Sequence, residues 1–224
     1  MGLREDVALG CRILATEDQG DFVWGHVSVR DPDGRGVWMK ASGWGFDEMD
    51  ADRVLLVSWD GEVLEGEGRR HLEYPIHTEL MRGRPDVYSV VHTHAPWTVA
   101  FGATAEPLRP LSHEGTLFVP PEVARFTLTG DLIVTQELGA QLAQTVGDRN
   151  VALMVNHGLV ACGGDVADAV FNAVFLERAC RTNMRALMAG GAKVWSSDDE
   201  ALAKREHVYS ARAAWDYFAR RFGG

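Results

Sequence analysis

A four-residue turn near the start of the chain constrains the fold most, because it reverses the chain between two strand-like stretches. The turn is Asp31-Pro32-Asp33-Gly34. Proline presets φ, glycine accepts positive φ, and an aspartate side chain can close the turn. The flanking stretches, residues 22–30 and 36–41, alternate between two kinds of side chain or are β-prone, so we expect them to pair as an antiparallel hairpin.

Strands and helices alternate along the rest of the chain. Further strands are predicted at residues 54–58, 63–64, 87–94, 132–134 and 151–162. Helices are predicted at residues 3–17, 73–82, from 96 onward, 137–146, from 165 onward, and at 199–220. Such a mixture favours an α/β or α+β arrangement in layers. Since no repeat or linker interrupts the pattern, we expect one domain over residues 1–224.

The composition excludes several classes of protein. A net charge of -10 argues against non-specific nucleic-acid binding, which depends on Lys and Arg at phosphates. A local pocket can still be basic, so a small anionic substrate remains compatible. The first residues lack a long apolar run, so we expect neither a signal peptide nor a membrane span. The three cysteines, an odd number without CxxC spacing, suggest reduced thiols in the cytoplasm.

Three histidines and a glutamate form the candidate metal site. Val91-His92-Thr93-His94 ends a predicted strand, and a period of two places both imidazoles on one face. His157, which we place near the middle of the strand 151–162, supplies a third ligand, and Gly158 would permit close approach of a ligand. Glu73 begins a helix and can act as fourth ligand, acid/base, or both.

Each of these features alone has a simpler interpretation. Most histidine pairs on strands belong to the core or the surface, and Asn-His-Gly often marks a turn. A glutamate at a helix start usually offsets the helix dipole. The metal hypothesis therefore depends on the combination. Three imidazoles with open positions suit Zn, Mn, Co or Fe, and we expect one divalent ion per subunit.

Two blocks of the chain, residues 71–103 and 152–180, resemble the signature blocks of the class II aldolase/adducin family. They contain Glu-x-x-x-His, Pro-Asp-Val, Val-His-Thr-His with a following proline, Asn-His-Gly, and a long helix with Leu-Glu. The resemblance implies a three-layer α/β/α sandwich with a largely antiparallel sheet. It also implies a homotetramer with active sites at subunit contacts. By the same resemblance His92, His94 and His157 match the metal ligands, and Glu73 matches the catalytic carboxylate.

The departures from the family pattern concern the substrate. Sugar-phosphate members have Asn where this chain has His26, and Ser-Ser where it has His71-Leu72. Arginine and histidine donors suit carboxylates, although an arginine pair on a loop is as often merely solvated. The residues that we expect to bind substrate are His26, Ser28, Ser42, Gly43, Arg69, Arg70 and His71.

Three functions follow from these expectations. The first is a metal-dependent carbon–carbon lyase that decarboxylates a hydroxylated aromatic or heteroaromatic carboxylate through a metal-stabilised enolate or phenolate. Trp24, Trp44 and Trp97 would then line an aromatic pocket, unless they belong to the core. The second is a sugar-phosphate aldolase or epimerase, disfavoured by the missing Asn and Ser-Ser. The third is a non-catalytic adducin-like assembly module, disfavoured by the complete set of metal ligands.

Overall fold

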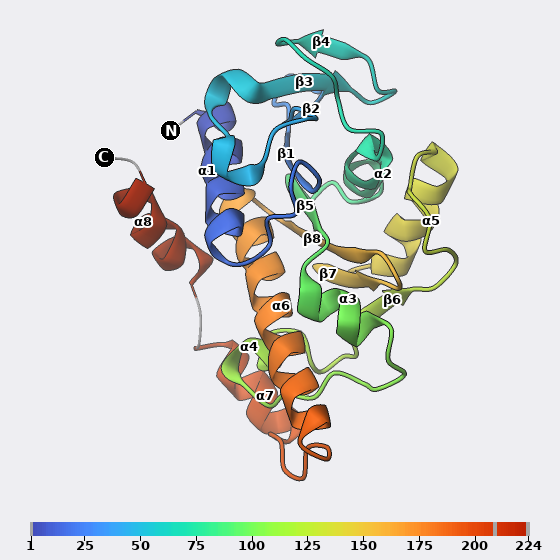
Figure 1. Cartoon of the computed structure of the whole chain (residues 1–224), viewed down its shortest axis with the longest axis vertical. Helices are drawn as coiled ribbons and strands as arrows, with labels where there is room; N and C mark the ends of the chain where they lie inside the picture. The colour runs from blue at the N-terminus through green and yellow to red at the C-terminus, as the bar shows by residue number, and fades with distance from the viewer. Residues whose placement is uncertain (1, 208–209, 223–224) are drawn as a thin grey trace.

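An eight-stranded sheet forms the centre of the computed structural model, which describes residues 2–207 and 210–222 (Figure 1). The strand order is β4-β3-β2-β1-β5-β8-β7-β6, and only the β6–β7 pair is parallel. The strands are β1 (His26–Arg30), β2 (Gly36–Lys40), β3 (Val54–Ser58), β4 (Val63–Glu65), β5 (Ser89–Thr93), β6 (Ala124–Phe126), β7 (Val151–Met154) and β8 (Gly158–Gly163). The predicted hairpin is the β1–β2 pair.

Helices cover both faces of the sheet, which confirms the three-layer α/β/α prediction (Figure 1). Helices α1 and α6, with α8 beside them, pack on one face, and α2 and α5 pack on the other. The helices are α1 (Leu3–Thr16), α2 (Tyr74–Gly83), α3 (Pro96–Gly102), α4 (His113–Thr116), α5 (Gln136–Val146), α6 (Val166–Met188), α7 (Asp198–Arg205) and α8 (Ala211–Phe222), with short 3₁₀ turns η1 (Phe46–Glu48) and η2 (Ala51–Arg53). No described helix is both long and apolar enough to cross a membrane.

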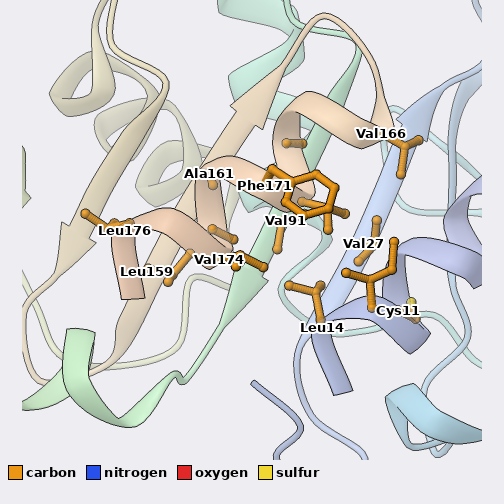
Figure 2. Packing of buried hydrophobic residues seen from close by; sticks show 14 of the residues in the cluster. Cys11, Leu14, Val27, Val91, Leu159, Ala161, Val166, Phe171, Val174 and Leu176 are labelled. Carbon is orange, nitrogen blue, oxygen red and sulfur yellow. The ribbon is translucent and has the colours of Figure 1, made fainter. Parts of the chain in front are cut away.

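The packing between the sheet and helices α1 and α6 fixes the strand register (Figure 2). Val27, Val91 and Ala161 lie opposite one another on β1, β5 and β8, and all three belong to this core. Burying an apolar side chain of this kind contributes roughly 1.5–3 kcal/mol. Because a slip of one residue would turn every side chain to the other face, the same packing directs His26 and His92 away from α1 and α6.

Helix α3 begins two residues after His94 and is anchored by a buried carboxylate from α6. Glu177 accepts hydrogen bonds from the backbone N–H groups of Trp97, at 2.9 Å, and Thr98, at 2.8 Å. Burial raises the pKa of this carboxyl. Glu177 thus satisfies helix N–H groups that would otherwise lack partners, and it ties α3 to the long helix.

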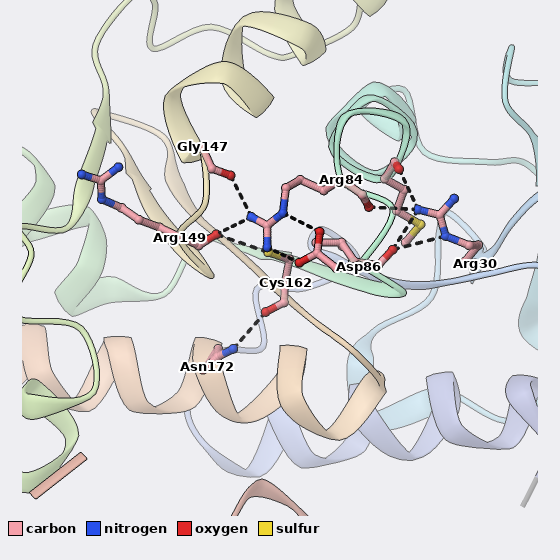
Figure 3. A network of polar contacts seen from close by, with 9 residues as sticks. Arg30, Arg84, Asp86, Gly147, Arg149, Cys162 and Asn172 are labelled. Carbon is pink, nitrogen blue, oxygen red and sulfur yellow. Dashed lines mark hydrogen bonds and ion pairs between the residues drawn. The ribbon is translucent and has the colours of Figure 1, made fainter. Parts of the chain in front are cut away.

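A network of arginines holds the opposite end of β5 (Figure 3). Arg84 donates to the carbonyls of Gly147, at 2.7 Å, and Arg149, at 3.0 Å. Arg30 donates to the carbonyls of Met81, at 2.6 Å, and Val87, at 2.9 Å. These contacts are with backbone oxygens of loops and helix ends, so the network stabilises connections between elements.

Several predicted boundaries were wrong for identifiable reasons. The first strand begins at His26 rather than at residue 22, because an Asp21–Trp24 bridge closes a tight turn ahead of it. Gly25, with φ of 74°, then redirects the chain into β1. Residues 132–134 form no strand, and the parallel strand β6 had not been predicted. The last predicted helix is two helices, α7 and α8, with residues 208–209 outside the described part of the chain.

Candidate metal centre

The four predicted residues lie together at one end of the sheet. His92 is the fourth residue of β5 and is fully buried, and His94 follows that strand. Glu73 is the residue immediately before α2. His157 lies in the turn between β7 and β8, not in the middle of one strand as predicted. Ligand atoms of Glu73, His92, His94 and His157 all lie within 4.8 Å of one another.

The turn that carries His157 depends on the residues on either side of it, Asn156 and Gly158. Asn156 has a φ of 60°, a value that asparagine tolerates better than most residues. A Cβ on Gly158 would lie 2.3 Å from the carbonyl oxygen of Thr93. Gly158 therefore allows β8 to approach β5, rather than allowing a ligand to approach the backbone as we had expected.

The distances between the imidazoles fit a single bound ion. The Nε2 atoms of His92 and His94 are 3.2 Å apart. Two nitrogens at about 2.0–2.1 Å from one ion are separated by roughly 2.8–3.0 Å in octahedral geometry and by roughly 3.3–3.4 Å in tetrahedral geometry, and the observed distance lies between these. The Nδ1–H of His92 donates to the carbonyl of Leu159 at 2.8 Å, so the lone pair of its Nε2 points to the centre. Burial lowers the pKa of His92 to about 3, which keeps the imidazole neutral for ligation.

His157 gives an independent indication that a ligand belongs here. Within the described residues, neither of its buried ring nitrogens makes a hydrogen bond of good geometry, and Nε2 only comes within 3.5 Å of Glu73 Oε1. A buried polar atom without a partner costs about 1–3 kcal/mol, and coordination of an ion through one nitrogen would remove that cost for it. The donor set of three imidazoles and one carboxylate therefore fits a divalent transition metal.

Glu73 is held between the histidines and the start of α2. Its Oε1 accepts a hydrogen bond from the backbone N–H of Ile133 at 2.8 Å and lies 3.5 Å from His157 Nε2. Its Oε2 lies 3.8 Å from His92 Nε2. Burial opposes the charge of Glu73, but the imidazoles of His157 and His92 outweigh burial and lower its pKa to about 2. An ionised carboxylate at this position can bind a metal or take up a proton.

Asp21 had not been identified from the sequence. Its Oδ2 lies 2.9 Å from His94 Nδ1, so the carboxylate accepts the Nδ1–H and leaves Nε2 free to face the centre. A carboxylate in this position orients a ligating imidazole and raises its basicity. Asp21 belongs to the turn that replaces the start of the predicted first strand. Because a strand was expected there, nothing in the sequence indicated that Asp21 lies beside His94.

A second layer of histidines lies beside the ligands. The ring of His26 lies opposite His92 in the β1–β5 register, with centroids 5.0 Å apart. His26 Nδ1 is 2.6 Å from His77 Nε2, and His77 Nδ1 is 2.7 Å from Ser28 Oγ. All three side chains are buried, and burial lowers the pKa of His77 to about 3. Ser28, predicted to bind substrate, thus contacts His77.

Lys40 is a buried cation beside this layer that the sequence had not revealed. Its Nζ donates to the carbonyls of Val23, at 3.0 Å, and Ala41, at 3.4 Å, and lies 3.3 Å from His71 Nε2. Burial lowers the pKa of Lys40 to about 8. Among the described residues no carboxylate lies within ion-pair distance of Lys40, and the charge of Glu48 acts on it only from further away.

A cavity of about 290 Å³ opens onto the metal centre. Its lining residues are Trp24, Gly25, His26, Ser42, His71, Leu72, Glu73, His94 and Leu132. Of the three tryptophans considered from the sequence, only Trp24 lines it. Trp97 packs against the core, and Trp44 stacks with Arg53. The cavity combines an apolar wall with imidazoles and a carboxylate.

Only some of the residues predicted to bind substrate line this cavity. Arg70 donates to the carbonyls of Gly61, at 2.6 Å, and His71, at 3.0 Å, and its guanidinium stacks over Tyr74. Arg69 and Gly43 are exposed. Arg69, Arg70 and Gly43 are absent from the described lining of the cavity, whereas His26, Ser42 and His71 belong to it.

Comparison with known proteins agrees with this geometry. The family model for the class II aldolase and adducin N-terminal domain matches residues 5–184. A 3,4-dihydroxyphthalate decarboxylase from Arthrobacter keyseri is 32% identical, over 96% of this chain and 91% of its own length. One from Rhodococcus jostii is 30% identical over 98% and 96%. An L-fuculose 1-phosphate aldolase from Glaciozyma antarctica superposes with a TM-score of 0.84 at 25% identity, over 99% of this chain and 90% of its own.

The family match extends across the residues that form the sheet, the metal centre and most of the helical layers. It covers well over half of the chain, and it agrees with the superposition on a solved aldolase structure. The chain belongs to the class II aldolase and adducin family.

Proposed function

We propose that this protein is a metal-dependent lyase that decarboxylates a dihydroxylated aromatic or heteroaromatic carboxylate. The observation that carries the proposal is the cavity lined by Glu73, His94 and His71, with the buried cation of Lys40 lying 3.3 Å from His71 Nε2 behind that wall. A compact anionic ring fits such a cavity, with one end at the ligands and its charge near the cation. The decarboxylases among its relatives support the same reaction class.

We propose that His92, His94 and His157 hold one divalent ion, of Zn, Mn, Co or Fe, with Glu73 in reach as a further ligand. Bound there, the ion would supply a Lewis acid that stabilises negative charge developing on a ring oxygen. Asp21 would keep His94 oriented, and the Leu159 carbonyl would keep His92 oriented.

Glu73 would move the proton that the reaction requires. As an ionised carboxylate it takes the proton of a ring hydroxyl, and as a carboxylic acid it returns that proton to the ring. The bond between the ring carbon and the carboxylate breaks, its electron pair stays on the ring carbon, and carbon dioxide leaves. That carbon then accepts the proton from Glu73, and the overall reaction takes up one proton from solvent. The Ile133 N–H holds Oε1 and leaves Oε2 for this exchange.

The remaining walls would select the substrate. Trp24, Leu72 and Leu132 offer apolar surface to the faces of a ring. His26, Ser42 and His71 offer polar atoms at the opposite side, close to Lys40. A phosphate dianion needs several directed donors, and two hydroxyls that sugar-phosphate enzymes of the family use are replaced here by His71 and Leu72.

A direct comparison of substrate classes tests the proposal. Enzyme loaded with each candidate metal is given dihydroxylated benzene and pyridine carboxylates, and separately fuculose 1-phosphate and ribulose 5-phosphate. We expect carbon dioxide from one of the aromatic acids and no cleavage or epimerisation of the sugars. Efficient turnover of a sugar phosphate, with no carbon dioxide from any aromatic acid, would overturn the preference.

We further propose that the protein forms a homotetramer in the cytoplasm. The resemblance to the family supports the assembly, and the three free, buried cysteines favour a reducing compartment. Phe22, which is exposed and lies edge-on against Trp24 of the cavity wall, offers apolar surface for a subunit contact. Light scattering at micromolar concentration should report four subunits, and a monomer would contradict the assembly.

A further inference from the structure

A buried chain of hydrogen bonds leads from the core to the wall of the cavity. It runs from the hydroxyl of Ser28 to His77 Nδ1, at 2.7 Å, and from His77 Nε2 to His26 Nδ1, at 2.6 Å. None of the three side chains is more than 2% exposed. Only His26 lines the cavity, so Ser28 and His77 can influence a substrate there only through His26.

The first link of the chain fixes the positions of the hydrogens. In the described part of the chain, His77 Nδ1 is the one hydrogen-bond partner of Ser28 Oγ. A buried hydroxyl hydrogen without an acceptor would cost about 1–3 kcal/mol, so the Ser28 hydroxyl donates and His77 Nδ1 accepts. A histidine whose Nδ1 accepts carries its hydrogen on Nε2.

The second link passes this constraint to His26. Because His77 carries its hydrogen on Nε2, it donates to His26 Nδ1. His26 Nδ1 is therefore an acceptor, and the hydrogen of His26 must lie on Nε2. The Val90 backbone also lies near the His77 ring, but a hydrogen donated from His77 Nδ1, to Val90 or to Ser28, would leave the Ser28 hydroxyl hydrogen unpaired in the core.

We propose that His26 is the specificity-determining donor of the cavity, a neutral imidazole whose Nε2–H binds a carboxylate oxygen of the substrate, with Ser28 and His77 as its positioning residues. This assignment rests on the proposed function, because it requires a carboxylated ring in the cavity. A neutral donor at this position recognises an anion without adding a second positive charge beside Lys40 or beside a metal held by His92. Position 28 therefore requires a side chain whose hydroxyl can donate a hydrogen bond to His77, and a small residue without a hydroxyl would not suffice.

The hydrogen positions are measurable without substrate. In 15N-histidine spectra of the zinc-loaded protein, with His26→Gln and His77→Gln used for assignment, we expect both residues to carry hydrogen on Nε2. Ser28→Ala removes the donor and should shift His77, and with it His26, toward the other tautomer. Ser28→Thr keeps the hydroxyl and should retain the original spectrum. Hydrogen on Nδ1 of His26 in the unsubstituted protein would overturn the proposal.

Ligand affinity provides the second measurement. Titration calorimetry compares 3,4-dihydroxybenzoate with catechol, which lacks the carboxylate. We expect Ser28→Ala to reduce the preference for the carboxylate on the order of tenfold, the typical effect of a hydrogen bond to a charged group. Catechol affinity should stay the same, and Ser28→Thr should restore the preference. An unchanged preference in Ser28→Ala would refute the role of the chain.

The two proposals fail in different ways. If the unsubstituted enzyme releases no carbon dioxide from aromatic acids, the proposed reaction is wrong, and the spectra of the unliganded protein still decide the state of His26. If carbon dioxide is released but His26 carries its hydrogen on Nδ1, the reaction stands and the donor assignment falls.

Discussion

Replacing His92, His94 or His157 with alanine is expected to abolish metal binding and activity and to leave the fold largely intact. Loss of a residue that only orients a ligand typically lowers metal affinity by about 10–100-fold, and loss of a ligand should cost more. His94 gives the cleanest variant, because it is half-buried and lies just outside β5. Elemental analysis after gel filtration measures occupancy, and far-UV circular dichroism measures the fold.

The same substitution at an exposed histidine provides the control. His113, at the start of α4, is exposed and lies outside the metal centre, so His113→Ala should keep both metal and activity. Full metal occupancy in all three ligand variants would show that the cluster does not hold the metal.

Substituting Glu73 with glutamine should lower the turnover rate by about 10²–10⁴-fold, the range typical for loss of general acid/base help. The amide keeps the size of the side chain and can still accept the Ile133 N–H, so the start of α2 should be unchanged. It cannot exchange a proton with the ring. Metal binding should persist at least in part, because three imidazoles remain.

Glu79 on the same helix offers a matched control, because it is half-buried and contacts Arg82 at the surface. Glu79→Gln should turn over substrate at close to the original rate. Turnover at saturating substrate separates the chemical step from binding. A Glu73→Gln enzyme as fast as Glu79→Gln would remove Glu73 from the mechanism.

The sequence predicted the layers and the ligands because both depend on local patterns. Alternation of side chains predicted β1, the turn after it predicted the pairing with β2, and the spacing of His92 and His94 on the predicted strand 87–94 placed two imidazoles on one face. The boundaries were less predictable. The run 151–162 is β-prone throughout, but the positive φ of Asn156 breaks it into a hairpin, which places His157 at a strand end facing the other ligands.

The residues missed by sequence reasoning act through contacts between distant segments. Lys40 occupies a strand position that carries no motif. Its place beside the site follows from its contacts with Val23 and His71, which lie far from it in sequence. Asp21 reaches His94 across 73 positions. In contrast, the adjacent Arg69 and Arg70 suggested a substrate-binding pair in the sequence. In the fold, Arg70 instead donates to the Gly61 carbonyl and stacks over Tyr74. Proximity of this kind is decided by tertiary packing, which spacing alone does not encode.

The carboxylate of Glu177 has a consequence for the rigidity of the metal centre. Only His94 and Ala95 separate β5 from α3, and this short connection is held at both ends, by the sheet at Thr93 and by Glu177 at Trp97. The backbone of His94 therefore loses its conformational freedom when the chain folds, not when an ion arrives. An incoming metal meets a preorganised ligand, and the entropic cost of ordering it has already been met by a helix that begins some seventy residues further along the chain.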